Sequence, residues 1–160
     1  FETLGKRLPD TLYLPLGNGT LVLGAIMAMD ELFALGLVPG PSHVVAVQAA
    51  GCAPVYRAWS GGAATVSQVH NAGTAAEGIA IAAPLRGTQV LAALRRIGAE
   101  VVLAPEDGIA AAARAVAARG FHIETTSAAT FAAFFARRAA GMQEGTVVLP
   151  LCGAGLKSMH

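Results

Sequence analysis

The sequence predicts an α/β fold: a three-layer, open and mainly parallel sheet with helices on both faces. Three observations support this prediction. Continuous apolar runs of strand length recur along the chain, alanine-rich runs of helix length lie between them, and glycines follow two of the helical runs. Apolar runs without polar alternation are typical of strands that are covered on both faces, and strand–helix alternation favours parallel pairing.

Four segments are expected to form the strands of this sheet. Each is a short run of aliphatic or β-branched residues with polar or turn-forming neighbours, a composition typical of strands. Because the runs contain few polar positions, we expect helices to cover both faces of the sheet. The expected strands are residues 11–16, 44–47, 101–103 and 146–150.

Helical patterns lie between these strands. The alanine-rich stretch at residues 110–118 has the highest intrinsic helix preference in the chain. Gly98 and Gly120 follow two of the helical runs, at positions where helices commonly end. Residues 60–75 have the weakest periodicity, so we expect a mobile surface loop there. The expected helices are residues 20–35, 89–97, 108–119 and 127–139.

Length, charge and cysteine content narrow the class of protein. The 160 residues suit one domain, residues 1–160, and the net charge of +1 favours neither a nucleic-acid nor a membrane partner. Apolar stretches such as residues 21–29 fall short of the about 20 residues that span a bilayer. Cys52 and Cys152 are too few for a disulfide framework, so we expect a cytoplasmic protein. The start at Phe1 instead of Met indicates processing or a piece of a longer chain.

The turn at residues 17–20 is the first candidate site. It joins an expected strand to an apolar helical run and reads Gly17, Asn18, Gly19 and Thr20. Such turns bind anions, because N–H groups converge there, no Cβ blocks close approach and the positive end of the helix dipole faces the ligand. The spacing matches neither a Walker loop nor Gly-x-Gly-x-x-Gly. A plain strand-to-helix turn is the alternative interpretation.

Two further candidates lie in the carboxyl-terminal third of the sequence. Cys152 follows the last expected strand, and ligands of open α/β sheets bind beyond the carboxyl ends of strands; a buried structural cysteine is the alternative. Glu124 precedes Thr125, Thr126 and Ser127, one of which is expected to cap the next helix. Glu124 is therefore either part of a capping segment or a carboxylate at the mouth of the sheet. Neither metal-ligand spacing nor a Gly-x-Ser-x-Gly elbow occurs, so no metal site or Ser-His-Asp triad is expected.

Five segments, in this order, resemble motifs of one enzyme superfamily. Residues 15–24 resemble the phosphate-binding loop of pyridoxal-phosphate enzymes with the tryptophan synthase β-like fold, called fold type II. Residues 45–54 resemble the next strand and loop of threonine synthases. Residues 74–84 and 123–129 are similar to that family's Thr-x-Ala-x-Gly-Ile and Glu-Pro-x-Ser-Ala-Ala segments. Residues 150–157 resemble its closing Thr-Gly-x-Gly-Leu-Lys, so the match covers nearly the whole chain and implies the large-domain part of this fold.

The resemblance implies a role for each matched residue. The backbone of the turn would hold the cofactor phosphate, and Cys152 takes the position of the Ser or Thr that contacts the pyridine nitrogen. In this fold type that partner is a neutral hydroxyl or thiol, so the ring nitrogen need not be protonated. Such a ring is a weaker electron sink, which suits elimination and replacement reactions more than transamination. Glu124 would line the pocket near the ring, and Glu77 and Gly78 would flank it. The implied phosphate-binding residues are Gly17, Asn18, Gly19, Thr20 and Leu21.

One part of the family pattern has no match in this sequence. These enzymes hold pyridoxal phosphate as a Schiff base on a lysine in a Ser-x-Lys pattern, which a Ser/Thr-Gly-Asn substrate loop follows. The lysines here are Lys6 and Lys157, and neither lies in such a context. We therefore expect the chain to be the carboxyl-terminal, phosphate-binding portion of a longer enzyme, with no catalytic residue or activity of its own. The missing amino-terminal portion and a small amino-acid substrate would be its partners, and exposed apolar surface would favour a homodimer.

The function that the resemblance implies is that of a threonine synthase-like lyase. Such an enzyme carries out γ-elimination and β-replacement on an O-phosphohomoserine-like substrate, and residues 45–54 favour this branch. Other fold type II enzymes are alternatives: threonine/serine dehydratase, diaminopropionate ammonia-lyase and cysteine synthase. A non-catalytic anion-binding module is a rival from another class.

Overall fold

Four strands form one sheet in which all neighbours are parallel. The computed structural model describes residues 1–143 and 145–155. The strand order is β3-β2-β1-β4, with a full five-residue register between β1 and β2 and a two-residue pairing between β1 and β4. This arrangement confirms the predicted parallel sheet. The strands are β1 (Thr11–Pro15), β2 (His43–Ala49), β3 (Glu100–Ala104) and β4 (Val147–Val148).

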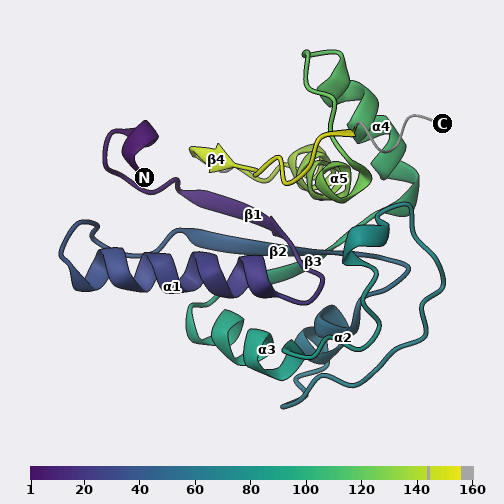
Figure 1. Cartoon of the computed structure of the whole chain (residues 1–160), viewed down its shortest axis with the longest axis horizontal. Helices are drawn as coiled ribbons and strands as arrows, with labels where there is room; N and C mark the ends of the chain where they lie inside the picture. The colour runs from purple at the N-terminus through teal and green to yellow at the C-terminus, as the bar shows by residue number, and fades with distance from the viewer. Residues whose placement is uncertain (144, 156–160) are drawn as a thin grey trace.

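Helices cover both faces of the sheet, as the sequence predicted. Figure 1 shows α1, α2 and α3 on one side of the strands and α4 and α5 on the other. Two single-turn 3₁₀ helices, η1 (Glu2–Leu4) and η2 (Glu77–Ile79), complete the described elements. The helices are α1 (Thr20–Ala34), α2 (Pro54–Ser60), α3 (Gly87–Arg96), α4 (Glu106–Ala117) and α5 (Thr125–Ala139).

The helix boundaries depart from the sequence prediction in two ways. α3, α4 and α5 each begin two residues earlier than expected. The residues that extend α3 and α5 are Gly87, Thr88, Thr125 and Thr126, which have low helix preference and resemble linkers in a sequence. α4 is extended by Glu106 and Asp107, which directly follow Pro105. α2 was missed altogether, because seven residues that begin with Pro54 are too few to display a helical period.

The two faces of the sheet bury two separate apolar clusters. Tyr13, Val45 and Val47 pack toward α4 and α5, whereas the alternate positions, such as Leu14 and Val44, pack toward α1, α2 and α3. Side chains of a strand alternate between its faces, so a strand that is covered twice must be apolar at nearly every position. This double burial explains the continuous apolar runs.

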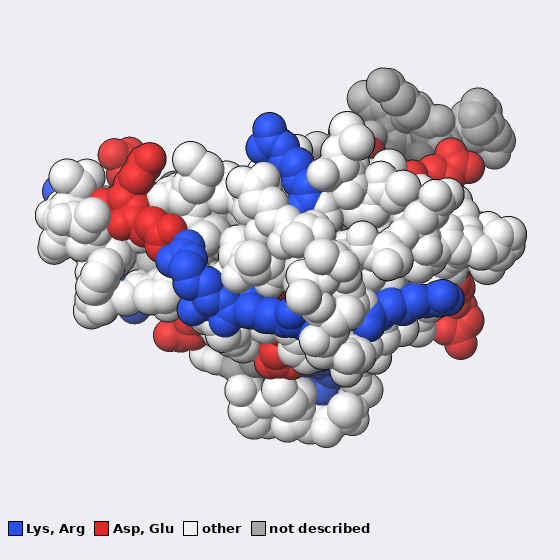
Figure 2. Space-filling view, turned by 90° about the horizontal axis from the view of Figure 1, so that it is seen from below, with Lys and Arg blue, Asp and Glu red and all other residues white. Residues whose placement is uncertain are grey.

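The surface over α1, α2 and α3 carries few charges. Figure 2 shows Lys and Arg side chains in a narrow row across this face, with most of the surrounding surface uncharged. An ion pair between Arg96 and Asp30, with 2.6 Å between Nη2 and Oδ2, joins α3 to α1. Met27, Phe33 and Leu35 are 60%, 57% and 71% exposed. In the part of the chain that the structure describes, no helix has the length and apolar character to cross a membrane.

A polar network links α5 to the amino ends of the strands. Arg137, in the last turn of α5, donates to Glu100 at the start of β3 (Nη1–Oε2 2.8 Å) and to the hydroxyl of Tyr13 in β1 (Nε–Oη 2.8 Å). His43, the first residue of β2, places its Nε2 2.8 Å from Oε1 of Glu100. The hydrogen bond from Arg137 lowers the pKa of Glu100, against an opposing effect of burial. One carboxylate therefore joins two strands and a helix.

We predict that Glu100→Gln lowers the free energy of unfolding by about 1–2 kcal/mol at pH 7, because a charged partner of Arg137 is lost. The pKa of Glu100 is lower in the folded protein, so its contribution is complete above the unfolded-state pKa of about 4.3 and is lost as pH falls further. Urea unfolding at pH 7 and pH 3 measures both effects. Glu31→Gln, at an exposed carboxylate of α1, is the control. A stability difference that stays constant down to pH 3 would contradict this role of Glu100.

Candidate functional site

The turn between β1 and α1 has a conformation that only glycine adopts easily. Gly19, the residue before α1, has φ of 86°. A Cβ at this position would also collide with the side chain of Val90 in α3. Gly19 provides no side-chain cap, so the first turn of α1 begins without one. The requirement for glycine thus leaves the start of α1 open to a ligand.

The backbone N–H groups of this turn are available to an acceptor. Leu16 donates to the carbonyl of Val47 (2.8 Å), and Leu23 donates to the carbonyl of Gly19 (2.9 Å). Between them, no hydrogen bond among the described residues uses the N–H groups of residues 17–22 as donors. Consecutive donors at the positive end of a helix dipole form an anion site. The predicted phosphate-binding residues, which include Leu21, lie together in this turn.

One wall of the candidate site is formed by η2 and the residues after it. The backbone of Gly17 lies so close to this segment that an added Cβ would be 3.3 Å from the carbonyl oxygen of Gly78 and 3.2 Å from Cα of Ile79. A Cβ on Gly78 would in turn be 2.5 Å from Oγ1 of Thr126 in α5. The structure therefore places Gly78 between the turn and the start of α5, with Glu77 exposed beside it.

The segment after β4 joins the same wall. The N–H of Cys152 donates to Oγ of the buried Ser127 (3.1 Å), and the N–H of Glu124 donates to the carbonyl of Gly153 (3.0 Å). Gly153 lies directly against the Glu124 side chain, since an added Cβ would be 2.6 Å from Oε2. Cys152 and Glu124, both predicted site residues, are thus neighbours. Lys157, at the end of the same motif, lies outside the described residues.

Two details of this segment correct the sequence analysis. Cys152 is exposed, so it is not the buried structural cysteine of the alternative interpretation. Glu124 itself occupies the N-cap position of α5, whereas Thr125, Thr126 and Ser127 lie inside the helix. Partial burial raises the pKa of the Cys152 thiol, and the charge of Glu124 raises it further. The thiol is therefore protonated and neutral near pH 7.

Glu106 is a residue of this region that the sequence analysis missed. It is the first residue of α4, and its carboxylate accepts hydrogen bonds from the N–H of Gly51 (3.1 Å) and the hydroxyl of Thr74 (2.8 Å). Residues 61–76 contain no helix or strand, as expected. They are nevertheless attached to the body of the protein, since the N–H of Ala72 donates to the carbonyl of Gly51 (2.9 Å). No local pattern signals Glu106, because its partners are 55 and 32 residues away.

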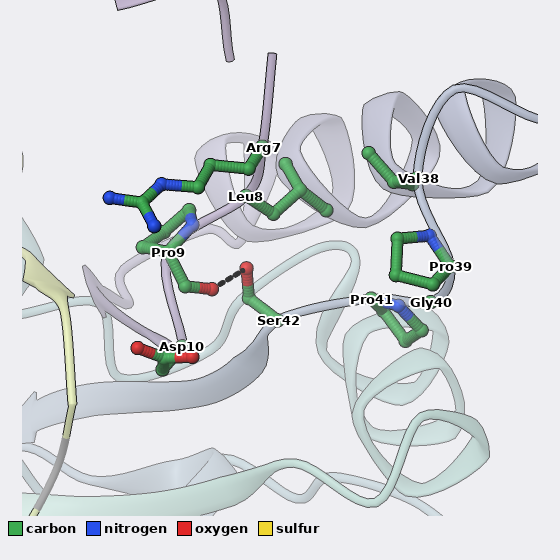
Figure 3. A pocket seen from close by; sticks show the side chains of 9 residues that line it. All are labelled: Arg7, Leu8, Pro9, Asp10, Val38, Pro39, Gly40, Pro41 and Ser42. Atoms are coloured by element: carbon green, nitrogen blue, oxygen red, sulfur yellow. Dashed lines mark hydrogen bonds between the residues drawn. The ribbon is translucent and has the colours of Figure 1, made fainter. Parts of the chain in front are cut away.

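These segments all lie at the carboxyl edge of the sheet. The turn follows β1, Gly51 follows β2, Glu106 follows β3 and Cys152 follows β4. A cavity of about 410 Å³ lies at the opposite edge, where residues 7–10 and 38–42 precede β1 and β2 (Figure 3). None of the predicted site residues lines that cavity, so it is separate from the candidate site.

Comparison with known proteins places this arrangement in a family. The model of the family described as pyridoxal-phosphate dependent enzyme matches residues 1–153. The chain belongs to this family. The match confirms the predicted superfamily and its cofactor, pyridoxal phosphate.

Relatives within and around the pyridoxal-phosphate-dependent family catalyse different reactions. The threonine synthase of Methanosarcina acetivorans is 29% identical over 132 residues, which are 82% of this chain and 33% of that protein. An L-serine ammonia-lyase from Rhizomucor miehei has a TM-score of 0.76 at 18% identity, over 96% of this chain and 48% of its own. The serine racemase of Dictyostelium discoideum has a TM-score of 0.71 at 23% identity, over 93% of this chain and 44% of the racemase chain. The chain thus spans about a third to a half of the proteins that it resembles.

The residues at the carboxyl edge fit pyridoxal phosphate. The turn offers N–H donors to a phosphate, and Cys152 offers a neutral thiol. Lys6 precedes β1 and so lies at the opposite edge of the sheet, away from the candidate site. Among the residues that the structure describes, no lysine lies at the carboxyl edge of the sheet.

We predict that Glu106→Ala loosens the segment around Thr74 and lowers the free energy of unfolding by about 2 kcal/mol. Three hydrogen bonds to a charged group are lost, from Gly51, Thr74 and the N–H of Ala75 (3.4 Å). Amide hydrogen exchange would show faster exchange at Gly51 and Ala75. Asp107→Ala is the matched control, since Asp107 is an exposed carboxylate in the same first turn of α4. Equal exchange rates in the two variants would show that Glu106 acts only on the helix dipole.

Proposed function

We propose that this chain is the phosphate-binding part of a threonine synthase-like enzyme, which uses O-phosphohomoserine for γ-elimination and β-replacement. The observation that carries the proposal is the turn at residues 17–22, whose backbone N–H groups have no acceptor among the described residues. The alignment of 132 residues with a threonine synthase supports the choice of reaction. We propose further that residues 1–160 are one domain of a longer enzyme.

The turn and the segment after β4 would divide the binding of pyridoxal phosphate between them. The N–H groups of residues 17–21 would hold the phosphate, at the positive end of α1. Cys152 would contact the pyridine nitrogen as a neutral donor or acceptor, because its thiol pKa is raised. Glu124 would line the pocket next to Cys152, and Glu77 and Gly78 would flank it. When bound, the cofactor supplies an electron sink for bond cleavage at the substrate amino acid.

Two other functions are supported by specific observations. The ammonia-lyase and the racemase named above share the fold over more than nine-tenths of this chain. Both act on serine by their names, and a serine or threonine dehydratase is therefore the second candidate. A non-catalytic anion-binding module is the third, because Lys6 lies at the wrong edge of the sheet.

Cofactor binding tests the proposal at the level of the turn. We predict that the chain binds pyridoxal phosphate at least about tenfold more tightly than pyridoxal, since charge-assisted hydrogen bonds to the phosphate contribute most. Gly19→Ala should abolish this preference by displacing the turn from Val90. Gly36→Ala is the matched control, because Gly36 also has a positive φ (68°) but lies beyond the other end of α1. Equilibrium dialysis with both ligands measures the preference. Loss of the preference in Gly36→Ala as well as in Gly19→Ala would show that the effect comes from reduced stability alone.

A substrate panel tests the reaction, in the enzyme that contains this chain together with its lysine-bearing part. With O-phosphohomoserine, we predict release of inorganic phosphate and formation of threonine. With threonine or serine, we predict no comparable release of ammonia and 2-oxo acid. The reverse result would assign the enzyme to the dehydratases.

A further inference from the structure

Gln48 is a polar side chain in a strand that is otherwise apolar after its first residue. β2 consists of His43, which is exposed, followed by six buried residues. Gln48 is 0% exposed. A buried amide destabilises a protein unless both of its ends are hydrogen-bonded. The partners of Gln48 therefore indicate what the residue does.

The two ends of the Gln48 amide bind two different segments. Oε1 accepts a hydrogen bond from the N–H of Tyr56 (2.9 Å), the third residue of α2. This bond caps α2, because the N-cap residue Ala53 has no side chain that could do so. Nε2 donates to the carbonyl oxygen of Leu16 (3.3 Å), directly before the turn that leads into α1.

The second bond fixes the direction of an N–H group of the turn. The peptide between Leu16 and Gly17 is trans, so its C=O and its N–H point in opposite directions. With the carbonyl directed at Gln48, the N–H of Gly17 is directed away from Gln48. The N–H of Leu16 is also fixed, by its 2.8 Å bond to the carbonyl of Val47. β2 thus controls the orientation of the peptide at which the turn begins.

We propose that Gln48 is a positioning residue that orients the N–H of Gly17 toward the cofactor phosphate. This inference rests on the proposed phosphate site in the turn. Gln48 acts through the Leu16 carbonyl and does not itself contact the phosphate. Its removal should therefore weaken binding of the phosphate group specifically and leave binding of the pyridine ring unchanged.

The structure provides a matched control at the other edge of the sheet. Ser42 is buried, directly precedes β2, and donates from Oγ to the carbonyl of Pro9 (2.6 Å), which lies just before β1 (Figure 3). Ser42 and Gln48 thus both donate from the β2 segment to a carbonyl that flanks β1. Loss of Ser42 is expected to lower stability by removing one buried hydrogen bond, without a change in the turn.

The test compares the affinities for pyridoxal phosphate and pyridoxal in three variants. We expect Gln48→Met to reduce the ratio of the two affinities about tenfold, with the affinity for pyridoxal unchanged. Gln48→Met/Ala53→Ser should show the same loss, because a serine at position 53 can cap α2 but cannot reach the Leu16 carbonyl. Ser42→Ala should keep the wild-type ratio. If Gln48→Met does not fold, Gln48→Asn retains an amide that is one methylene shorter, and the same loss is expected.

Specific outcomes would overturn the inference or the proposal beneath it. A wild-type ratio in Gln48→Met, or its full recovery in Gln48→Met/Ala53→Ser, would show that Gln48 only caps α2. A wild-type protein without preference for pyridoxal phosphate would refute the phosphate site itself. In that case the ligand-free amide NMR spectrum decides the role of Gln48: an unchanged Gly17 resonance in Gln48→Met would overturn the orienting role, and a shifted one would support it.

Discussion

The close packing of the turn between β1 and α1 is the constraint on which the candidate site depends. Its backbone touches α3 through Gly19 and Val90, and it touches the segment around Gly78 through Gly17. An added Cβ would collide with Val90 at Gly19 and would lie tightly against Ile79 and Gly78 at Gly17, so the turn presents backbone where most turns present a side chain. Because the turn packs against two segments that lie about 60 and 70 residues further along the chain, its geometry depends on the fold as a whole.

Single polar side chains hold the walls of this site in an otherwise apolar interior. Gln48 holds the base of the turn, Glu106 holds Gly51 and Thr74, and Ser127 holds the backbone of Cys152. Each of these side chains forms hydrogen bonds with loop groups, either backbone groups or a hydroxyl. Without these bonds, the loop groups would not be joined to the body of the fold. A buried polar group that is fully bonded favours one arrangement of its neighbours, because every alternative leaves it unsatisfied. The loops at the carboxyl edge are therefore positioned by specific bonds and not only by apolar packing.

The sequence predicted the layers of the fold and the residues of the turn, and it missed these polar contacts. Strands and long helices leave a periodic pattern in the local sequence, and the glycines of the turn are a local signal too. Gln48 and Glu106 act on partners 32 and 55 residues away, and no pattern within a window of sequence contains such pairs. The exposure of Cys152 and the contact of Gly153 with Glu124 likewise follow from the return of the chain after β4, which only the tertiary structure reveals.

The amino and carboxyl edges of the sheet differ in the interactions that their polar groups make. At the amino edge, the ion pair of Arg137 with Glu100 joins α5 to β3, and the hydrogen bond from Arg137 to the Tyr13 hydroxyl joins α5 to β1. At the carboxyl edge, the N–H groups of residues 17–22 have no acceptor among the described residues, and the Cys152 thiol contacts the carbonyl of Pro150 only two residues away (3.7 Å), so neither joins distant elements. The carboxyl edge is held by other side chains, since Glu106 and Ser127 bind its loops and Gln48 binds the base of the turn. The backbone donors of the turn are therefore not needed to join these loops to the sheet that positions them.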